Sequence, residues 1–196
     1  MANIMTIVPG QVRGIRSLFF RRVRGQYGGV VPGVFQILAV DLRVARAVGA
    51  IYSHLHLRKV SYLTRLQREM LATVVNGKVG GAPCLGLHTA AVRRLTGDEH
   101  LTQEFATTWR EYKLDGDTRA LLQYASKLTE TPSLVDKDDI ESLRESGWSD
   151  RAIWEITALV SFFNFSGRME AASGMPADQI PEEAEFEEAR GTLRAA

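Results

Sequence analysis

The chain has 196 residues, of which 45% are hydrophobic and 24% are charged, and its formal net charge is +1. This length and apolar content suffice for one domain with a core of its own. The balanced charge does not suggest a nucleic-acid surface, and no apolar run reaches membrane-spanning length. We therefore expect a single-domain cytoplasmic protein with neither nucleic-acid nor membrane partners.

The two ends of the chain carry opposite charge. The first 40 residues contain no acidic residue, while 178–190 contain six. Apolar residues recur at helical intervals in the basic segment, which predicts an amphipathic helix in an extension spanning 1–24. We expect it to pack on its own subunit, on a neighbouring subunit or against the acidic tail, 178–196. Its arginines are Arg13, Arg16, Arg21, Arg22 and Arg24.

Helix start and stop signals then follow one another along the chain. Asp41 can cap a helix that ends near residue 57, and Thr64 with Gln67 forms a capping-box pattern that predicts a helix over 64–76. The glycines at 77, 80 and 81 end that helix. Pro83 suits the first turn of the next helix, which ends at Gly97.

The second half of the chain also contains helix start and stop signals. We expect them over 98–112, 117–131, 136–147 and 149–172, the last of them strongly apolar. Alternating patterns typical of strands are lacking. The sequence therefore predicts an all-α bundle.

A thiol and an imidazole lie four residues apart in the predicted helix that starts near Pro83. Cys84 and His88 would share one helix face, one turn apart, with Cys84 in the first turn. The partial positive charge of a helix N-terminus favours a thiolate, and His88 can take its proton. Glu69, on the preceding helix, is a candidate to orient the imidazole. Cys84 is the only cysteine, so no intramolecular disulfide can form.

This pattern resembles the AhpD-like, peroxidase-related branch of the carboxymuconolactone decarboxylase family. The family motif is a glutamate, eleven residues, then Cys-x-x-Cys-x-x-x-His, and Glu69, Cys84 and His88 fall on it. Gly81 stands in place of the first cysteine. Three further blocks, 27–48, 121–156 and 162–169, also resemble the family in the right order, although Gly167 replaces a usual asparagine. The resemblance implies an AhpD-like helical bundle over 25–177 and a homo-oligomer.

Three functions remain open on this sequence. In the first, Cys84 is a one-cysteine peroxidatic thiol, with His88 as its base and Glu69 as the orienting carboxylate, and an external thiol is the reductant. In the second, Glu69 and His88 perform cofactor-independent acid/base chemistry, of decarboxylase, isomerase, dehydratase or cyclase type. In the third, the chain is a non-catalytic oligomeric binding protein.

The surroundings of this site indicate a small, partly apolar substrate. We expect Leu87 and Phe163, with Leu85 and Trp154, to line the pocket. Asn164 and Arg168 lie one helical turn apart in an apolar run, so they either bridge to another helix or bind substrate. No cofactor or metal is expected: a metal on Cys84, His88 and Glu69 is conceivable, but the spacing does not demand it. The remaining histidines are interpreted as solvated or packed: His54, His56 and His100.

Overall fold

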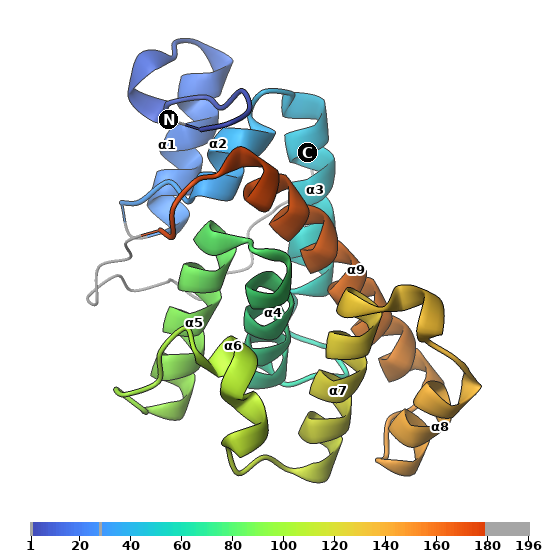
Figure 1. The fold of residues 1–196 in the computed structure, drawn as a ribbon. Helices are drawn as coiled ribbons and strands as arrows, with labels where there is room; N and C mark the ends of the chain where they lie inside the picture. The colour runs from blue at the N-terminus through green and yellow to red at the C-terminus, as the bar shows by residue number, and fades with distance from the viewer. Residues whose placement is uncertain (1, 28, 179–196) are drawn as a thin grey trace.

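A central helix, α4 (Arg65–Val79), organises the molecule in this computed structural model, which describes residues 2–27 and 29–178. It packs against α5, α6, α7 and α9 (Figure 1). Leu71, Val74 and Val75 of α4 are completely buried. The other elements are η1 (Pro9–Gln11), α1 (Ile15–Gln26), α2 (Gly33–Leu38), α3 (Leu42–Leu55), α5 (Ala82–Thr96), α6 (Phe105–Thr108), η2 (Trp109–Glu111), α7 (Gly116–Glu130), η3 (Pro132–Leu134), α8 (Lys137–Glu145) and α9 (Asp150–Ser173).

The prediction of an all-α protein is confirmed for the described residues, which contain no strand. Local capping explains most boundaries. The side chain of Asp41 accepts from the backbone of residues 43 and 44 at the start of α3, and the Thr64–Gln67 capping box opens α4. Asp136 and Ser149 cap α8 and α9 as predicted. None of the described helices is long and apolar enough to cross a membrane.

The predicted helix over 98–112 is wrong in its first half. The Asp98 side chain accepts from the backbone of His100 and its carbonyl accepts from Leu101, which makes a local turn, and helical structure resumes at Phe105 in the short α6. Thr102 likewise bonds the nearby backbone of Glu104 instead of supporting a continuous helix. The α5–α6 connection is therefore irregular.

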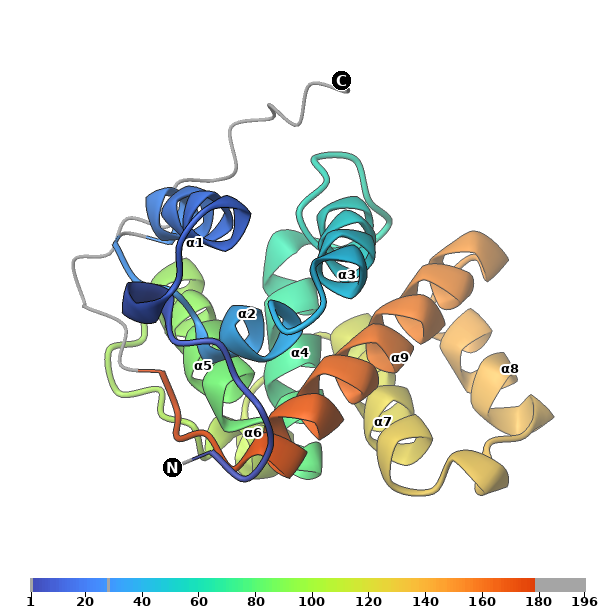
Figure 2. The same cartoon turned by 90° about the horizontal axis from the view of Figure 1, so that it is seen from above.

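The basic N-terminal segment packs on its own chain. Phe20 and Val23 of α1 are buried against Val31 and Ala39, and Arg16 donates to the carbonyl of Ala39. Figure 2 shows α2 between α1 and α9. The predicted acidic tail, beyond Asp178, lies outside the described residues.

Candidate functional site

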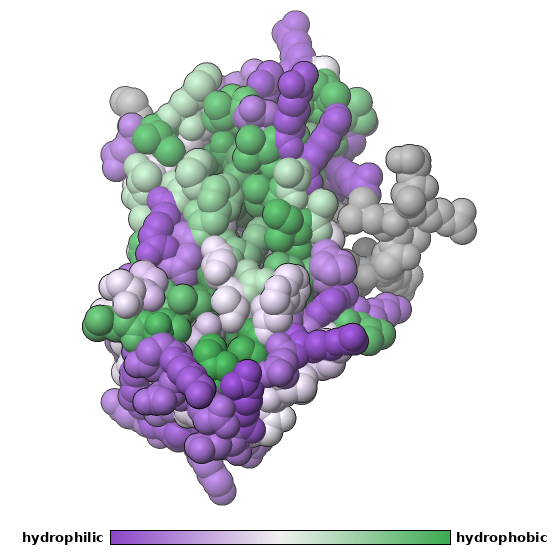
Figure 3. All heavy atoms as spheres, turned by 90° about the vertical axis from the view of Figure 1, so that its right-hand side faces the viewer, coloured by the Kyte–Doolittle hydropathy of each residue, from purple (hydrophilic) through white to green (hydrophobic). Residues whose placement is uncertain are grey.

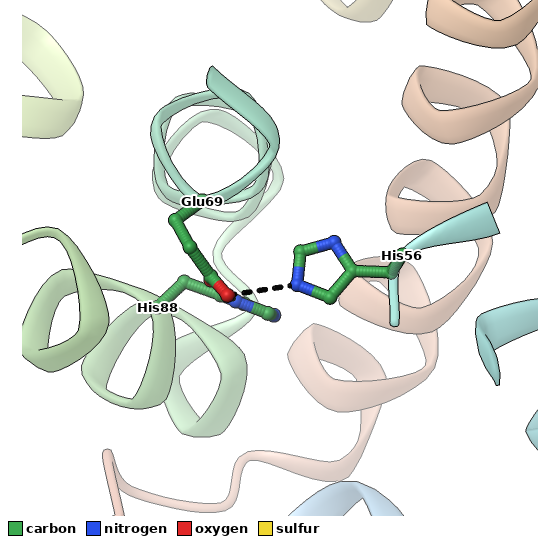
Figure 4. Close-up of side chains that lie close together, drawn as sticks. All are labelled: His56, Glu69 and His88. Carbon is green, nitrogen blue, oxygen red and sulfur yellow. Dashed lines mark hydrogen bonds and ion pairs between the residues drawn. The ribbon is translucent and has the colours of Figure 1, made fainter. Parts of the chain in front are cut away.

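Glu69, in the middle of α4, is buried and contacts two imidazoles and one guanidinium group. Its exposed fraction is 1%. His88 Nδ1 of α5 lies 2.5 Å from Oε2, and His56 Nε2 lies 3.0 Å from Oε1 (Figure 4). Arg65 Nη2, one turn earlier on α4, lies 2.5 Å from Oε1. One carboxylate therefore holds both imidazoles, with the arginine compensating its charge.

His56 is the member of this group that sequence reasoning missed. It lies just past the end of α3, where it is completely buried and stacks on Tyr52 with ring centroids 4.9 Å apart. The sequence indicates a solvated or packed residue here, as for His54 and His100, whereas His56 bonds Glu69. Its position follows from how α3 packs near α4, and no local sequence signal reports that contact.

The protonation states of His56 and Glu69 follow from their burial and from their contacts. Burial lowers the pKa of His56 to about 4, so this imidazole is neutral at neutral pH. Burial alone would raise the pKa of Glu69, but His56 and His88 outweigh it and hold that pKa well below its usual value. An ionised carboxylate only accepts, so both imidazoles donate to it. His88 Nδ1 donates to Glu69, and the described residues provide no partner for the other ring nitrogen, Nε2.

Cys84 lies in the first turn of α5, as predicted, but it is not poised as a thiolate. Its backbone N–H donates to Glu170 Oε2 of α9 at 3.0 Å. Burial and the neighbouring Glu170 carboxyl raise the pKa of the thiol well above its usual value. The thiolate expected at the helix N-terminus is therefore disfavoured, first because the thiol is buried and second because the Glu170 carboxyl group of α9 lies beside it.

A small apolar cavity lies beside the Cys84 thiol and the His88 imidazole. Cys84 and His88 both line it, and its volume is about 40 Å³. Tyr27 and Tyr52 lie in the same wall, and burial raises the pKa of each, so both phenols stay protonated. The remaining wall is aliphatic or aromatic, apart from glycine and serine: Val34, Phe35, Leu38, Val48, Gly49, Leu87, Phe162, Phe163 and Ser166.

The structure separates the expected substrate-binding residues into two groups. Leu87 and Phe163 line the cavity, and Phe163 also packs edge-on against the rings of His56 and His88. Asn164 and Arg168 do not line it. Arg168 donates to Asn164, which donates to Thr129 of α7, so this pair joins α9 to α7. Two other expected lining residues, Leu85 and the largely exposed Trp154, are also absent from the wall.

The candidate metal ligands differ from those considered in the sequence. His56, Glu69 and His88 offer ligand atoms within 4.8 Å of one another, whereas Cys84 is not in this group. Arg65 already compensates the single carboxylate, and both imidazoles aim N–H groups at it. A divalent cation would sit beside a guanidinium with only one anionic ligand. The donor set therefore fits a hydrogen-bonded network better than a cation.

The two glycines that depart from the family pattern touch each other. A Cβ atom added at Gly81 would lie 2.8 Å from the Cα of Gly167 and 2.6 Å from Asn76 Oδ1. A Cβ atom added at Gly167 would lie 2.4 Å from a methyl group of Val79. The N-terminus of α5 and the backbone of α9 thus approach more closely than side chains there would allow.

Restoring the motif cysteine is therefore expected to destabilise the protein. Gly81→Cys forces Asn76 and the backbone at Gly167 to move, which should cost about 1–3 kcal/mol. Urea denaturation of the wild type and of Gly81→Cys measures the difference, with Gly25→Cys, where a Cβ atom meets nothing within 4 Å, as the control. Equal stability of Gly81→Cys and wild type would contradict the close approach.

Solved structures with the same arrangement of helices include two peroxidase-related proteins and a debrominase. One from Silicibacter sp. TM1040 is 31% identical, with 93% of this chain and 96% of that chain covered and a TM-score of 0.78. Another, described as an alkylhydroperoxidase AhpD core from Ralstonia eutropha JMP134, is 26% identical, with 90% and 92% covered and a TM-score of 0.78. The debrominase Bmp8 in complex with 2,3,4-tribromopyrrole shares the fold, at 20% identity, 91% coverage of both chains and a TM-score of 0.66.

The fold and these similarities define the class. No protein-family model matches the sequence, and no protein of curated function matches it. The similarity to the Silicibacter protein extends over nearly the whole of both chains. The chain belongs to the AhpD-like, peroxidase-related branch of the carboxymuconolactone decarboxylase family.

Proposed function

We propose that this protein reduces a small peroxide through Cys84 and that an external thiol returns the cysteine to its reduced state. The observation that carries the proposal is the cavity, in which a thiol and an imidazole share about 40 Å³. A water molecule needs about 10–15 Å³ of such volume. A hydroperoxide group therefore fits without rearrangement, while a ring-sized substrate requires the lining side chains to move.

The sulfur nucleophile of the reaction lines this cavity, and the reductant comes from outside the protein. The Cys84 sulfur attacks one oxygen of the peroxide, an S–O bond forms and the O–O bond breaks. The thiol proton ends on the departing oxygen, which leaves as water or an alcohol. An external thiol then attacks the sulfenic acid sulfur, water leaves, and a second external thiol releases Cys84 and forms the external disulfide.

The imidazole and the phenols position the peroxide for this attack. The Nε2 lone pair of His88 can accept the peroxide O–H, since Glu69 keeps the ring in the Nδ1–H tautomer. Tyr27 and Tyr52, whose side chains are hydrogen-bonded to each other, face the peroxide from the same wall. Glu69 and His56 do not line the cavity, so they act as positioning residues through His88.

The experiment that tests the proposal is a stoichiometric peroxide pulse on the reduced protein, followed by trapping with a sulfenic-acid reagent and mass spectrometry. We expect a single adduct at Cys84, and catalytic peroxide consumption once a small dithiol is added. Cys84 that remains fully reduced while peroxide persists would overturn the proposal.

A second function, acid/base catalysis by His88 and Glu69, is favoured by the raised pKa of Cys84. A thiol kept protonated acts as part of the wall, while His88 with an ionised partner can still move a proton on a small carbonyl compound. This chemistry requires His88 and Glu69 but not the thiol. An unreactive Cys84 in the peroxide pulse would make it the working hypothesis, ahead of a non-catalytic binding protein.

We further propose that the protein is a homo-oligomer, with a second copy seated on the face formed by α3 and α9. Figure 3 shows apolar side chains gathered in a hollow on this side of the molecule, bordered above and below by hydrophilic ones. Val44 and Ile51 of α3 and Trp154 and Phe165 of α9 are between 42% and 66% exposed. Apolar surface of this kind buries against a second copy without leaving charges unpaired.

Substitution on this face tests the assembly. Ile51→Asp should lower the molar mass measured by light scattering, because it places a carboxylate in the contact. Leu134→Asp, at an exposed leucine on η3, is the matched control and should leave the mass unchanged. A wild-type protein that is already monomeric would refute the oligomer.

A further inference from the structure

The first turn of α5 receives its cap from another helix. The N-cap residue is Gly81, which has no side chain, and no side-chain cap comes from α5 itself. A capping side chain ordinarily accepts from the backbone N–H two or three residues on. Here that N–H belongs to Cys84, and Glu170 Oε2 of α9 accepts it at 3.0 Å.

Two oxygen atoms fill the place that a side chain at position 81 would take. A Cβ atom there would lie 3.0 Å from Glu170 Oε2 and 2.6 Å from Asn76 Oδ1. Glu170 is 1% exposed, and its Oε1 and Asn76 Oδ1 have no hydrogen-bond partner among the described residues. Acceptors buried without partners are costly, so a proton that reaches Glu170 from the thiol gains an acceptor there.

The same carboxyl group faces the thiol. Burial raises the pKa of Glu170 to about 7, and its hydrogen bond with Cys84 partly opposes that rise. Cys84, in turn, has Glu170 as its hydrogen-bonding side-chain neighbour. His88, which the sequence suggested as the base, has its Nδ1 committed to Glu69, and its Nε2 has no partner among the described residues.

We propose that Glu170 is the proton acceptor of the Cys84 thiol and stands where the family motif has its first cysteine. The carboxyl group replaces a second thiol, and Gly81 leaves it room. As the thiol sulfur attacks the peroxide, its proton moves to Glu170, and Glu170 passes a proton to the departing oxygen. The step balances, because one S–O bond forms, the O–O bond breaks and one proton is transferred. This peroxide step rests on the proposed function, but the pairing of thiol and carboxyl does not.

Several charged or titratable groups surround this pair. Asp178, which accepts from the backbone N–H of Gly33, raises the pKa of both Glu170 and Cys84. Glu69 lies further away on α4 and acts in the same direction on Cys84. His88 lies one turn along α5, and Tyr27 and Tyr52 face the thiol across the cavity. Of these groups, Glu170 is the one that accepts from the backbone of Cys84, and it is the charged neighbour that raises the pKa of the thiol most.

Two rates measured on the same protein test the proposal. Alkylation by iodoacetamide consumes thiolate and needs no proton for a leaving group, whereas peroxide reduction needs one. Glu170→Gln removes a negative charge, so we expect the alkylation midpoint to shift to lower pH and alkylation below it to become about tenfold faster. We expect sulfenic acid formation to become at least about tenfold slower in the same variant.

The control removes a charge without touching the thiol. Asp178→Asn keeps an acceptor for the Gly33 N–H, and it should accelerate alkylation slightly without slowing the peroxide step. Glu170→Asp, which keeps a carboxyl group with a shorter reach, should react with peroxide at an intermediate rate, and it decides the question if Glu170→Gln fails to fold.

Two results would overturn the proposal. One is an alkylation midpoint that does not move in Glu170→Gln. The other is a peroxide rate that rises together with alkylation, since Glu170 would then act only as a charge. If wild-type Cys84 alkylates but does not react with peroxide, the proposed function fails, while the alkylation midpoint of Glu170→Gln still decides the pairing.

Discussion

Cys84→Ser is expected to reduce peroxide consumption to the rate measured without protein. The chain contains no other sulfur nucleophile of this kind, since Cys84 is its only cysteine. A serine oxygen has no route to a sulfenic acid, and a buried hydroxyl is a far weaker nucleophile than a thiol. The assay is loss of peroxide at fixed protein and dithiol concentrations.

The control for this variant changes a comparable side chain at the other end of the same helix. Thr96→Ser keeps the hydroxyl that bonds the Val92 carbonyl, and it should consume peroxide at the wild-type rate. A Cys84→Ser protein that retains more than about a tenth of the wild-type rate would contradict thiol chemistry and favour a reaction that depends on His88.

Glu69→Gln is expected to lower peroxide consumption by about two to four orders of magnitude. Both carboxylate oxygens of Glu69 accept from an imidazole. An amide can accept at only one of these positions, so the other imidazole must turn an acceptor nitrogen toward the new NH₂ group. If His88 changes tautomer, its Nε2 becomes a donor and can no longer accept the peroxide proton.

We expect Glu69→Gln to affect the rate of peroxide consumption more strongly than the free energy of unfolding. Gln keeps the shape of Glu and part of its hydrogen bonding, so we expect a loss of about 1–3 kcal/mol in the free energy of unfolding, measured in urea. Glu99→Gln, at an exposed position between α5 and α6, should change neither quantity. A Glu69→Gln protein as active as wild type would show that the carboxylate does not orient His88.

Local signals in the sequence predicted much of the fold. Asp41, Thr64, Asp136 and Ser149 each bond backbone groups two or three residues away, and such caps are visible in sequence because donor and acceptor are neighbours. The failure at 98–112 has the same origin, since Asp98 makes the right local bond for a turn as well as for a helix.

In the candidate site, too, contacts encoded by local sequence spacing were predicted and contacts made by tertiary packing were missed. The contact of Glu69 with His88 was expected from the family spacing and is present. His56 and Glu170 were missed because they reach the site through tertiary packing. Glu170 bonds the backbone of Cys84 across 86 positions of sequence, and neither helical periodicity nor a cap pattern encodes such a pair.

The wall of the cavity selects by charge as well as by size. Among the described residues that line it, none is lysine, arginine, aspartate or glutamate. An anion drawn into this space would lose its hydration and find only phenol, hydroxyl, imidazole and thiol groups in exchange, at a cost of several kcal/mol. Uncharged molecules bear no such cost. The site should therefore admit hydrogen peroxide or a neutral alkyl hydroperoxide and turn away peroxynitrite or a fatty-acid carboxylate.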